Sequence, residues 1–412
     1  MPPIRPRLLY LSPIMPKPEG NGLAMRAALT LAALAERFEI DLFVLPVAGP
    51  AEPPGDFLRA RVARIGVADP EACLDTHFAL IRRLADPAAR TAAEIAYPQP
   101  ALSCLCTAIA ASRLADWVGG RRYAALHVFR LYLAPLVARL RGAIGFERVV
   151  IDLDDDDAAY QDGLAALHAD VGAAAEAGKY RALAARCLPE ADLCLLAAPA
   201  DRDRFAGRFP GTRFATLRNA CPPARLLERA TTPAALRLLF VGTLGYPPNA
   251  DAAVLLIRDI LPILRQRAPV PVRLTIAGAG APPALCAMAE AATVALPGYV
   301  EDLAPLYAEA DMVAAPLRFG GGSPIKLIEA FAFRRPVVAT RFAAAGLEAE
   351  DGEHLLLADD ARDFAAACLR LWTDPAFAAA CAGRAAALWQ AEFHPDRVAG
   401  SLADAYESLA IG

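Results

Sequence analysis

Short apolar runs alternate with longer segments of helical periodicity along most of the chain. The short runs are rich in Val, Ile and Leu, and the longer segments repeat Ala and Leu at helical spacing. In the first half, the short runs predict strands at Arg7–Ser12, Ile40–Val47, Ala63–Val67, Tyr123–Phe129, Arg148–Leu153, Ala191–Ala197 and Arg213–Arg218. The longer segments predict helices, most clearly at Leu23–Arg37, Ala101–Trp117 and Ala173–Cys187. Such alternation is typical of βαβ units, which build parallel sheets covered by helices.

The alternation stops near the middle of the chain and then starts again. Ala220-Cys221-Pro222-Pro223 and Thr231-Thr232-Pro233 show no apolar period, so residues 223–236 are predicted to form a linker. Beyond the linker, the pattern predicts strands at Arg237–Leu244, Val272–Ala277, Val294–Leu296, Met312–Pro316, Pro336–Thr340 and His354–Ala358. Helices are predicted at Asp251–Gln266, Pro283–Ala292, Leu303–Ala310 and Ser323–Phe333.

The sequence therefore predicts an α/β protein with two doubly wound, Rossmann-like domains. The N-terminal domain is expected at residues 1–222, the second domain at 237–394 and a C-terminal helix at 395–412. Domains of this kind bind ligands at the carboxyl ends of their strands, so a site is expected in a cleft between the two.

Length and composition support this division and exclude other classes. The chain has 412 residues, about the length of two domains of ~150–200 residues each. With 56% apolar residues, 21% charged residues and a mean hydropathy of +0.33, the chain is too apolar for an intrinsically disordered protein. A net charge of −4 predicts no general attraction to nucleic acid.

Cysteine usage and the N-terminal sequence indicate a cytoplasmic protein. The nine cysteines are scattered and contain no Cys-x-x-Cys pair, which is typical of buried thiols in a reducing compartment. The apolar run Leu8–Leu11 is cut short by Pro13 and Pro16, so it does not form a secretory signal. The longest charge-free stretch, Ile95–Ser112, is broken by prolines. Its part Ala101–Ser112 is interpreted as a buried helix, with contact to a lipid surface as the alternative.

The most informative segment for chemistry lies between the strand that ends near Arg318 and the helix that follows it. Gly320-Gly321-Gly322-Ser323-Pro324 predicts a tight turn, an N-cap and a proline at the first helical position. Free backbone N–H groups at such a helix start attract phosphate. Arg318 and Lys326 flank the turn and would add positive charge.

Two charged residues on the helix after this turn suit a nucleoside diphosphate. Lys326 and Glu329 are three residues apart and share one face. The cation would meet the pyrophosphate and the carboxylate would accept hydrogen bonds from the ribose hydroxyls. The alternative is a glycine-rich turn with an exposed ion pair, worth only ~0.3–0.5 kcal/mol.

This segment and several others resemble the C-terminal domain of the retaining glycosyltransferases of family 4, which have the GT-B fold. The resembling segments, in chain order, are Leu239-Phe240-Val241-Gly242-Thr243-Leu244, Tyr246-Pro247-Pro248-Asn249-Ala250-Asp251, Ile276-Ala277-Gly278-Ala279-Gly280, Gly298-Tyr299-Val300-Glu301-Asp302 and Arg335-Pro336-Val337-Val338-Ala339-Thr340. The resemblance implies that Glu329 binds the donor ribose and that Gly242 lies in the donor-binding loop.

The chain departs from the family pattern at two places. Gly321 stands where the family often has a glutamate at the donor sugar, so backbone N–H groups of the glycine turn would serve there. The loop from Thr243 to Asn249 lacks the Arg and Lys that many members place on the diphosphate. Arg318 and Lys326 are the expected replacements, and we assign both a catalytic role on the leaving diphosphate.

The first half resembles the family more loosely. Glu19-Gly20-Asn21-Gly22, followed by Arg26, resembles the glycine loop that faces donor phosphates and acceptor, although an ordinary turn between strand and helix has the same pattern. His127 falls where relatives carry an active-site histidine, and Arg130 is a comparable candidate. A histidine in an apolar strand is also typical of a hydrogen-bonded core residue.

The acidic run Ile151-Asp152-Leu153-Asp154-Asp155-Asp156-Asp157 has several interpretations. It could bind a divalent metal, or form the nucleophile loop of a haloacid-dehalogenase-like phosphatase, which would want Thr or Val where Asp156 stands. A solvated strand end is the third interpretation, since like charges in a block seek water. The family generally needs no metal, and its resembling segment implies a place on the acceptor side, so neither a metal nor a cofactor is expected.

The nucleotide-site pattern and the family resemblance together predict a glycosyltransferase. The resemblance implies that it retains the anomeric configuration and acts in polysaccharide or glycoconjugate biosynthesis. Its partners would be a nucleotide-sugar donor and a saccharide or lipid-linked acceptor. Arginines at Arg59–Arg64, Arg82-Arg83 and Arg121-Arg122 fit either solvated helix ends or peripheral contact with the inner membrane face. A sugar-nucleotide epimerase of the same fold and a non-catalytic binding protein, suggested by Gly321, are the alternatives.

Overall fold

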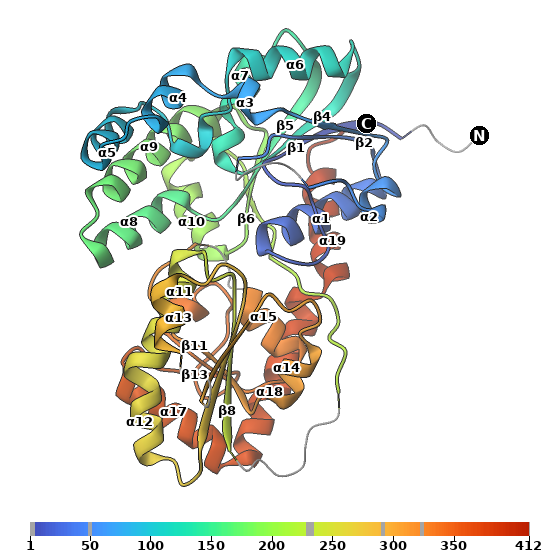
Figure 1. Ribbon diagram of the computed structural model, residues 1–412. Helices are drawn as coiled ribbons and strands as arrows, with labels where there is room; N and C mark the ends of the chain where they lie inside the picture. Colours follow the sequence, from blue (N-terminus) through green and yellow to red (C-terminus); the bar gives the residue numbers. More distant parts are fainter. Residues whose placement is uncertain (1–4, 48–51, 228–234, 290–292, 322–324, 412) are drawn as a thin grey trace. The chain divides into compact units, whose positions relative to one another are not determined.

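The computed structural model describes residues 5–47, 52–227, 235–289, 293–321 and 325–411, which form two units (Figure 1). Unit 1 comprises Met1–Arg218 together with Ala399–Gly412, and unit 2 comprises Asn219–Val398. The chain therefore passes from one unit to the other at Arg218, four residues before the predicted end of the first domain, and its last residues belong again to unit 1. Most of the predicted linker, residues 228–234, lies outside the described residues.

Unit 1 is built on a seven-stranded parallel sheet with strand order β3-β2-β1-β4-β5-β6-β7. The strands are β1 (Arg7–Ser12), β2 (Glu39–Val44), β3 (Arg64–Val67), β4 (Arg122–Phe129), β5 (Gly145–Asp154), β6 (Leu193–Leu196) and β7 (Phe214–Thr216). The chain order reverses between β1 and β4. The loops that leave these two strands therefore diverge at the carboxyl ends of the strands.

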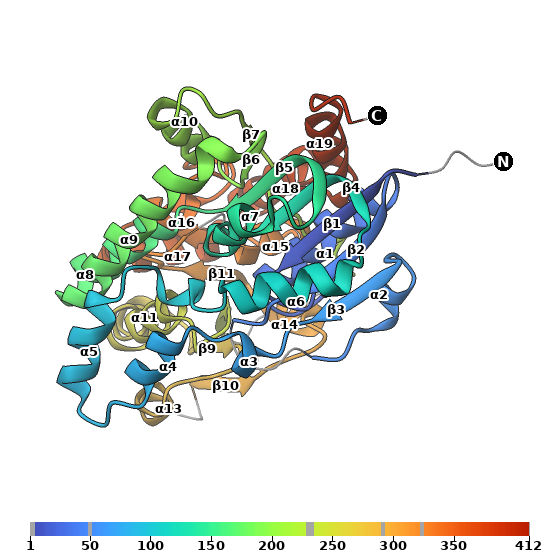
Figure 2. The ribbon, with the colours of Figure 1, turned by 90° about the horizontal axis from the view of Figure 1, so that it is seen from above.

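Helices cover the sheet of unit 1. They are α1 (Gly22–Ala35), α2 (Asp56–Arg59), α3 (Pro70–Cys73), α4 (Thr76–Arg82), α5 (Pro87–Ala96), α6 (Ala108–Val118), α7 (Pro135–Leu140), α8 (Asp157–His168), α9 (Val171–Cys187) and α10 (Pro199–Arg208), with short 3-10 turns at Ala101–Ser103, Leu131–Leu133 and Leu188–Glu190. Figure 2 shows α8 and α9 lying side by side at the border of this unit. Among the described residues, no helix combines the length and apolar character needed to cross a membrane.

The prediction of one helix over Ala101–Trp117 is wrong in its first part. A 3-10 turn ends at Ser103, and α6 starts only after Thr107, whose hydroxyl oxygen accepts a hydrogen bond from the N–H of Ala110. The hydroxyl of Ser103 and the thiol of Cys106 both donate to the carbonyl of Tyr132. These tertiary hydrogen bonds hold the segment out of a continuous helix.

Unit 2 is built on a six-stranded parallel sheet with strand order β10-β9-β8-β11-β12-β13. The strands are β8 (Leu236–Val241), β9 (Val272–Ala277), β10 (Val294–Gly298), β11 (Met312–Ala315), β12 (Val337–Ala339) and β13 (Leu356–Leu357). Its helices are α11 (Pro247–Leu255), α12 (Leu261–Arg267), α13 (Pro283–Met288), α14 (Ala304–Glu309), α15 (Ile325–Ala332), α16 (Arg341–Ala344), α17 (Ala361–Thr373) and α18 (Pro375–Leu388), with π-helical turns at Leu256–Ile260 and Trp389–Phe393.

Two doubly wound parallel sheets confirm the predicted fold class, and each predicted strand is present within a few residues of its expected ends. Each unit has its own apolar core, made largely of strand residues and of the helix faces that pack on them. The central strands β1 and β8 are apolar on both faces because helices cover both sides of each sheet. The strand order of unit 2 reverses between β8 and β11.

The last helix, α19 (Pro395–Glu407), begins in unit 2 and belongs to unit 1 from Ala399 onward. Its residue Tyr406 is fully buried and forms a hydrogen bond between its hydroxyl and Nδ1 of His127, 2.7 Å apart. Arg37 of unit 1 donates to the carbonyl of Ala403 and to the carboxylate of Glu407. The core of the N-terminal unit therefore depends on residues from the end of the chain.

Candidate functional site

The strongest candidate site lies in unit 2, where β8 and β11 are neighbours in the sheet. These strands pair through Met312 with Leu238 and Val313 with Leu239, and α11 and α15 follow them. Figure 1 shows α11 and α15 at the same end of the sheet. A reversal of strand order is where the connections of a doubly wound sheet diverge and where such sheets bind ligands.

Lys326, in the first turn of α15, reaches across to α11. Its Nζ donates to Oδ1 of Asn249 over 3.0 Å and lies 5.5 Å from the centre of the Phe240 ring. The side chain is half-buried. Burial lowers the pKa of its amine to about 8, against the opposing effect of the Glu329 carboxylate. Lys326 is thus a cation that titrates close to physiological pH.

Asn249 joins the two loops. Besides accepting from Lys326, its amide donates through Nδ2 to the carbonyl of Thr243 over 2.9 Å. Gly242 makes room for this amide, since a Cβ atom at that position would lie 2.7 Å from Nδ2. Packing against Asn249 therefore explains glycine at position 242. Sequence reasoning quoted Asn249 as part of a motif but gave it no role.

Glu329 lies one turn further along α15, also half-buried. Its Oε2 accepts a hydrogen bond from the hydroxyl of Tyr307 over 3.2 Å. Tyr307 belongs to α14, is fully buried and stacks on Phe333 with ring centres 4.2 Å apart. Burial raises the pKa of the Glu329 carboxyl to about 7, while Tyr307 and Lys326 act in the opposite direction.

The exposed-ion-pair interpretation of Lys326 and Glu329 does not describe this geometry. Each side chain has its own polar partner from another helix, Asn249 for the lysine and Tyr307 for the glutamate. Tyr307 had no sequence signal that distinguished it from an ordinary core tyrosine. The structure thus brings Lys326 and Glu329 together with two residues that sequence reasoning missed.

Arg318, the second predicted cation, is paired with α11. Its guanidinium donates from Nε and Nη2 to the two carboxylate oxygens of Asp251, at 3.0 and 2.5 Å. The arginine side chain is 38% exposed and the aspartate 12%. A phosphate could reach Arg318 only by sharing it with, or displacing, the carboxylate of Asp251.

The glycine turn before α15 is described only in part. Gly320 has a φ of +148°, and a Cβ there would contact the Pro248 side chain and the Phe342 ring at 3.7 Å. Gly321 is exposed. Gly322, Ser323 and Pro324 lie outside the described residues, so the predicted N-cap and phosphate-binding N–H groups remain predictions.

The predicted loop in unit 1 places its arginine inside the protein. Asn21 caps α1 by accepting from the N–H of Ala24 over 2.9 Å, between Gly20, with a φ of +109°, and Gly22, the first residue of the helix. Arg26 is only 2% exposed. The expectation that its guanidinium faces the donor phosphates is therefore not supported by its position.

Arg26 instead forms a buried ion pair with the first residue of the acidic run. Its Nε and Nη2 donate to Asp152 at 3.1 and 2.8 Å, and its Nη1 donates to the carbonyl of Leu217 over 2.8 Å. Asp154 is 3.5 Å away. Burial would lower the pKa of Arg26, but these two carboxylates raise it above its usual value.

Arg130 pairs with three further carboxylates of the acidic run, and Asp156 pairs with Arg204 at 2.9 Å. Arg130 has a left-handed φ of +78° at the end of β4 and forms ion pairs with Asp154 at 3.2 Å, Asp155 at 2.6 Å and Asp157. Burial raises the pKa of Asp155 to about 8 although Arg130 opposes the shift. The solvated-end interpretation of the run is therefore wrong. Within the described residues, no cluster of His, Cys, Asp and Glu is placed to hold a metal ion.

His127 is a core residue in this structure. It is fully buried, its Nδ1 is bonded to Tyr406, and its ring stacks on Tyr10 with centres 4.5 Å apart. Burial lowers its pKa to about 3, with a further contribution from Arg26. The geometry favours the core interpretation over the catalytic role that we predicted, because neither ring nitrogen reaches solvent.

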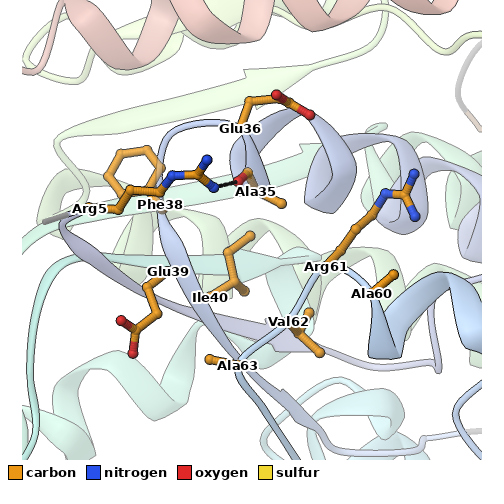
Figure 3. Close-up of a pocket in the computed structure, with 10 residues that line it drawn as sticks. All are labelled: Arg5, Ala35, Glu36, Phe38, Glu39, Ile40, Ala60, Arg61, Val62 and Ala63. Atoms are coloured by element: carbon orange, nitrogen blue, oxygen red, sulfur yellow. Dashed lines mark hydrogen bonds between the residues drawn. The ribbon is translucent and has the colours of Figure 1, made fainter. Parts of the chain in front are cut away.

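A groove of about 800 Å³ lies elsewhere on unit 1 (Figure 3). It is lined by the amino end of β2, the segment that leads into β3 and the end of α1. Arg5 closes one side by donating to the carbonyl of Ala35 over 2.8 Å. Because the groove lies at the amino ends of the strands, it is at the opposite edge of the sheet from Arg26 and Arg130.

Comparisons with known proteins agree with the architecture. The sequence model of the family described as Glycosyl transferases group 1 matches residues 235–374, which lie within unit 2. No curated protein matches the chain.

Solved structures match over nearly the whole chain. Sucrose-phosphate synthase from Thermosynechococcus elongatus is 16% identical, with a TM-score of 0.69, over 98% of this chain and 99% of that one. HepE from Anabaena, solved in complex with UDP-glucose, is 17% identical with a TM-score of 0.61, over 98% and 100%. A glycosyltransferase from Rickettsia africae is 9% identical with a TM-score of 0.62, over 98% and 99%. The chain therefore has the fold of these proteins, with two Rossmann-like domains.

Proposed function

We propose that the protein is a glycosyltransferase that transfers a sugar from a nucleoside diphosphate sugar to a hydroxyl group of a saccharide or lipid-linked acceptor. The family match over unit 2 and the fold shared with HepE, which binds UDP-glucose, support this class. Retention of the anomeric configuration and a role in polysaccharide or glycoconjugate biosynthesis belong to the same proposal and rest on the resemblance to family 4. Nine free cysteines support a cytoplasmic location.

The observation that carries the proposal is the placement of Lys326 and Glu329 on one helix at the β8/β11 reversal of unit 2. A half-buried carboxylate with a single tyrosine partner has oxygen lone pairs left for the ribose hydroxyls. Such hydrogen bonds favour the ionised carboxylate and would lower the pKa of Glu329 from its value of about 7.

The chemical role of Lys326 follows from the charge that develops during transfer. As the bond between sugar and diphosphate breaks, negative charge accumulates on the leaving diphosphate, and a fixed cation stabilises it most in a partly desolvated site. Asn249 holds Lys326 in such a place. Arg318, which is paired with Asp251, would add a second positive charge when its guanidinium binds the diphosphate as well as that carboxylate. A front-face displacement, as the resemblance implies, needs no nucleophile from the enzyme.

Nucleotide-sugar binding provides the first test. A panel of UDP- and GDP-sugars is screened by thermal shift, where a bound donor stabilises by RT ln(1 + [L]/Kd). Glu329→Gln should weaken the selected donor by about 10- to 100-fold, because a hydrogen bond to a charged group contributes ~1.5–3 kcal/mol. Lys326→Ala should weaken it similarly.

A matched control exists in unit 1. Lys179 is half-buried and pairs with Glu176, three residues away, at 3.0 Å. Lys179→Ala removes a comparable lysine and should leave donor affinity unchanged. If Lys326→Ala and Lys179→Ala have the same effect on donor affinity, the assigned site is wrong.

Turnover then separates the proposed activity from its alternatives. A transferase releases UDP or GDP in step with glycosylated acceptor. An epimerase changes the sugar without an acceptor, and a binding protein shows affinity with no product. Absence of stabilisation by every nucleotide and nucleotide-sugar would contradict the proposal as a whole.

A further inference from the structure

The side-chain amide of Asn249 is the link between the two loops of the candidate site. Oδ1 accepts from Nζ of Lys326 over 3.0 Å, and Nδ2 donates to the backbone carbonyl of Thr243 over 2.9 Å. Asn249 is itself only 6% exposed. Its amide thus connects the β8–α11 loop to the first turn of α15, 77 residues further along the chain.

Among side chains of nearly the same shape, only the amide of asparagine can make both contacts. The carbonyl of Thr243 needs a donor, and the ammonium group of Lys326 needs an acceptor. An aspartate carboxylate could accept a hydrogen bond from Lys326 but has no proton to donate to the Thr243 carbonyl. Leucine could form neither hydrogen bond. Gly242 leaves the space in which the amide lies, since a Cβ there would come within 2.7 Å of Nδ2.

We propose that Asn249 is a positioning residue that holds the amine of Lys326 at the diphosphate site through an amide oxygen anchored on the Thr243 carbonyl. This inference rests on the proposed function of Lys326. It adds that donor binding depends on a neutral residue that need not touch the donor. The loop from Thr243 to Asn249 lacks the Arg and Lys of the family pattern. It would then contribute to donor binding by positioning Lys326 of α15.

The same hydrogen bond bears on the protonation of Lys326, whose pKa burial lowers and the Glu329 carboxylate raises. The groups that face this amine are the neutral amide of Asn249 on α11, the Phe240 ring on β8 and the carboxylate of Glu329 on α15. Nearby Asp251 and Arg318 are paired with each other. An ammonium group donates a stronger hydrogen bond than a neutral amine, so the amide oxygen favours the charged form against the effect of burial.

Two near-isosteric variants should shift the pKa of Lys326 in opposite directions. Asn249→Asp places a carboxylate at the position of the amide oxygen, which should raise the pKa of Lys326 by about 1 or more. Asn249→Leu removes the acceptor and should lower it. If the amide oxygen of Asn249 had no influence on Lys326, Asn249→Leu could destabilise unit 2 but would leave the pKa of Lys326 unchanged.

The small number of lysines makes this measurable without any donor. The chain contains only Lys17, Lys179 and Lys326, so lysine labelled with ¹³C at Cε gives three signals, and Lys326→Arg assigns one of them. In the wild type, the Lys326 signal should titrate near pH 8. It should move upward in Asn249→Asp and downward in Asn249→Leu, while the other two signals serve as internal controls.

The result that overturns the proposal is a Lys326 titration midpoint that is the same in the wild type and both variants. Thermal unfolding of each variant checks that unit 2 is folded. If Asn249→Leu does not fold, the comparison of the wild type with Asn249→Asp still decides the question.

Donor binding separates this inference from the proposed function. The affinity of the selected nucleotide should fall as pH rises above about 8 in the wild type, and this fall should move to higher pH in Asn249→Asp. A wild type that binds no nucleotide contradicts the proposed function, whatever the lysine titration shows. A wild type that binds, with a pH profile that Asn249→Asp leaves in place, contradicts the positioning role alone.

Discussion

Removal of the carboxylate of Asp152 should destabilise unit 1 strongly, because it leaves the guanidinium of Arg26 buried without its main partner. Arg26 and Asp152 have side chains that are 1% and 0% exposed, joined by hydrogen bonds of 2.8 and 3.1 Å. Loss of one partner from a buried pair costs about 3–5 kcal/mol. Asp154, at 3.5 Å, retains part of the attraction, so Asp152→Ala should cost about 3 kcal/mol, near the lower limit.

The assay is thermal and urea unfolding of the full chain, followed by far-UV circular dichroism. For a domain of this size, a loss of ~3 kcal/mol lowers the Tm of unit 1 by roughly 6–12 °C. The double variant Arg26→Met with Asp152→Leu replaces the pair by apolar groups and should be more stable than Asp152→Ala.

This experiment also decides the role of Arg26. If Arg26 acted on the donor, Arg26→Met would abolish transfer while leaving the stability of unit 1 close to that of the wild type. A change below about 1 kcal/mol in Asp152→Ala would refute the reasoning, since that is the range of a solvent-exposed pair.

Three further predictions concern pH and packing. The pKa of His127 lies near 3 in the folded protein, below its unfolded value, so its contribution to stability is present above about pH 6.5 and is lost as pH falls. His127→Gln should therefore flatten the pH dependence of Tm between pH 6 and 4. Equal slopes of Tm against pH in the wild type and the variant would contradict this. The pKa of Glu329 is raised to about 7, so the protonated carboxyl adds stability at low pH that is lost as pH rises through 7. In unfolding experiments at pH 8 without donor, Glu329→Gln should therefore be more stable than the wild type by about 1–3 kcal/mol. Gly242→Ala should weaken nucleotide affinity, because its Cβ would displace the Asn249 amide that holds Lys326. Unchanged affinity in a binding assay would exclude that packing.

Local pattern was sufficient for the strands. Each buried parallel strand is a short apolar run bounded by turn residues, and this signal needs no knowledge of the neighbouring strands. The helix predicted over Ala101–Trp117 failed because the competing interaction is distant: the carbonyl of Tyr132 bonds Ser103 and Cys106, which ends the first turn early.

In the candidate site too, some features follow from local spacing and others only from the tertiary structure. Lys326 and Glu329 share a face of α15 because they are three residues apart in one helix, and this could be predicted from spacing alone. Their partners Asn249 and Tyr307 lie 77 and 22 residues away and come from other helices, so no spacing rule relates them. The pKa values of about 8 and 7 depend on those partners and on burial.

The amino-acid sequence by itself determined the order of strands and helices, the two sheets, and the pair of charged residues on α15, since each of these depends on periodicity and on neighbours a few residues apart. Only the tertiary structure decided which charges are free to act. Arg26 and Arg130 became buried partners of the acidic run, and His127 became part of the core, because strands distant in the sequence bring these groups together. Electrostatic and hydrogen-bonding energies depend on distance in space and on burial, and the fold alone sets both.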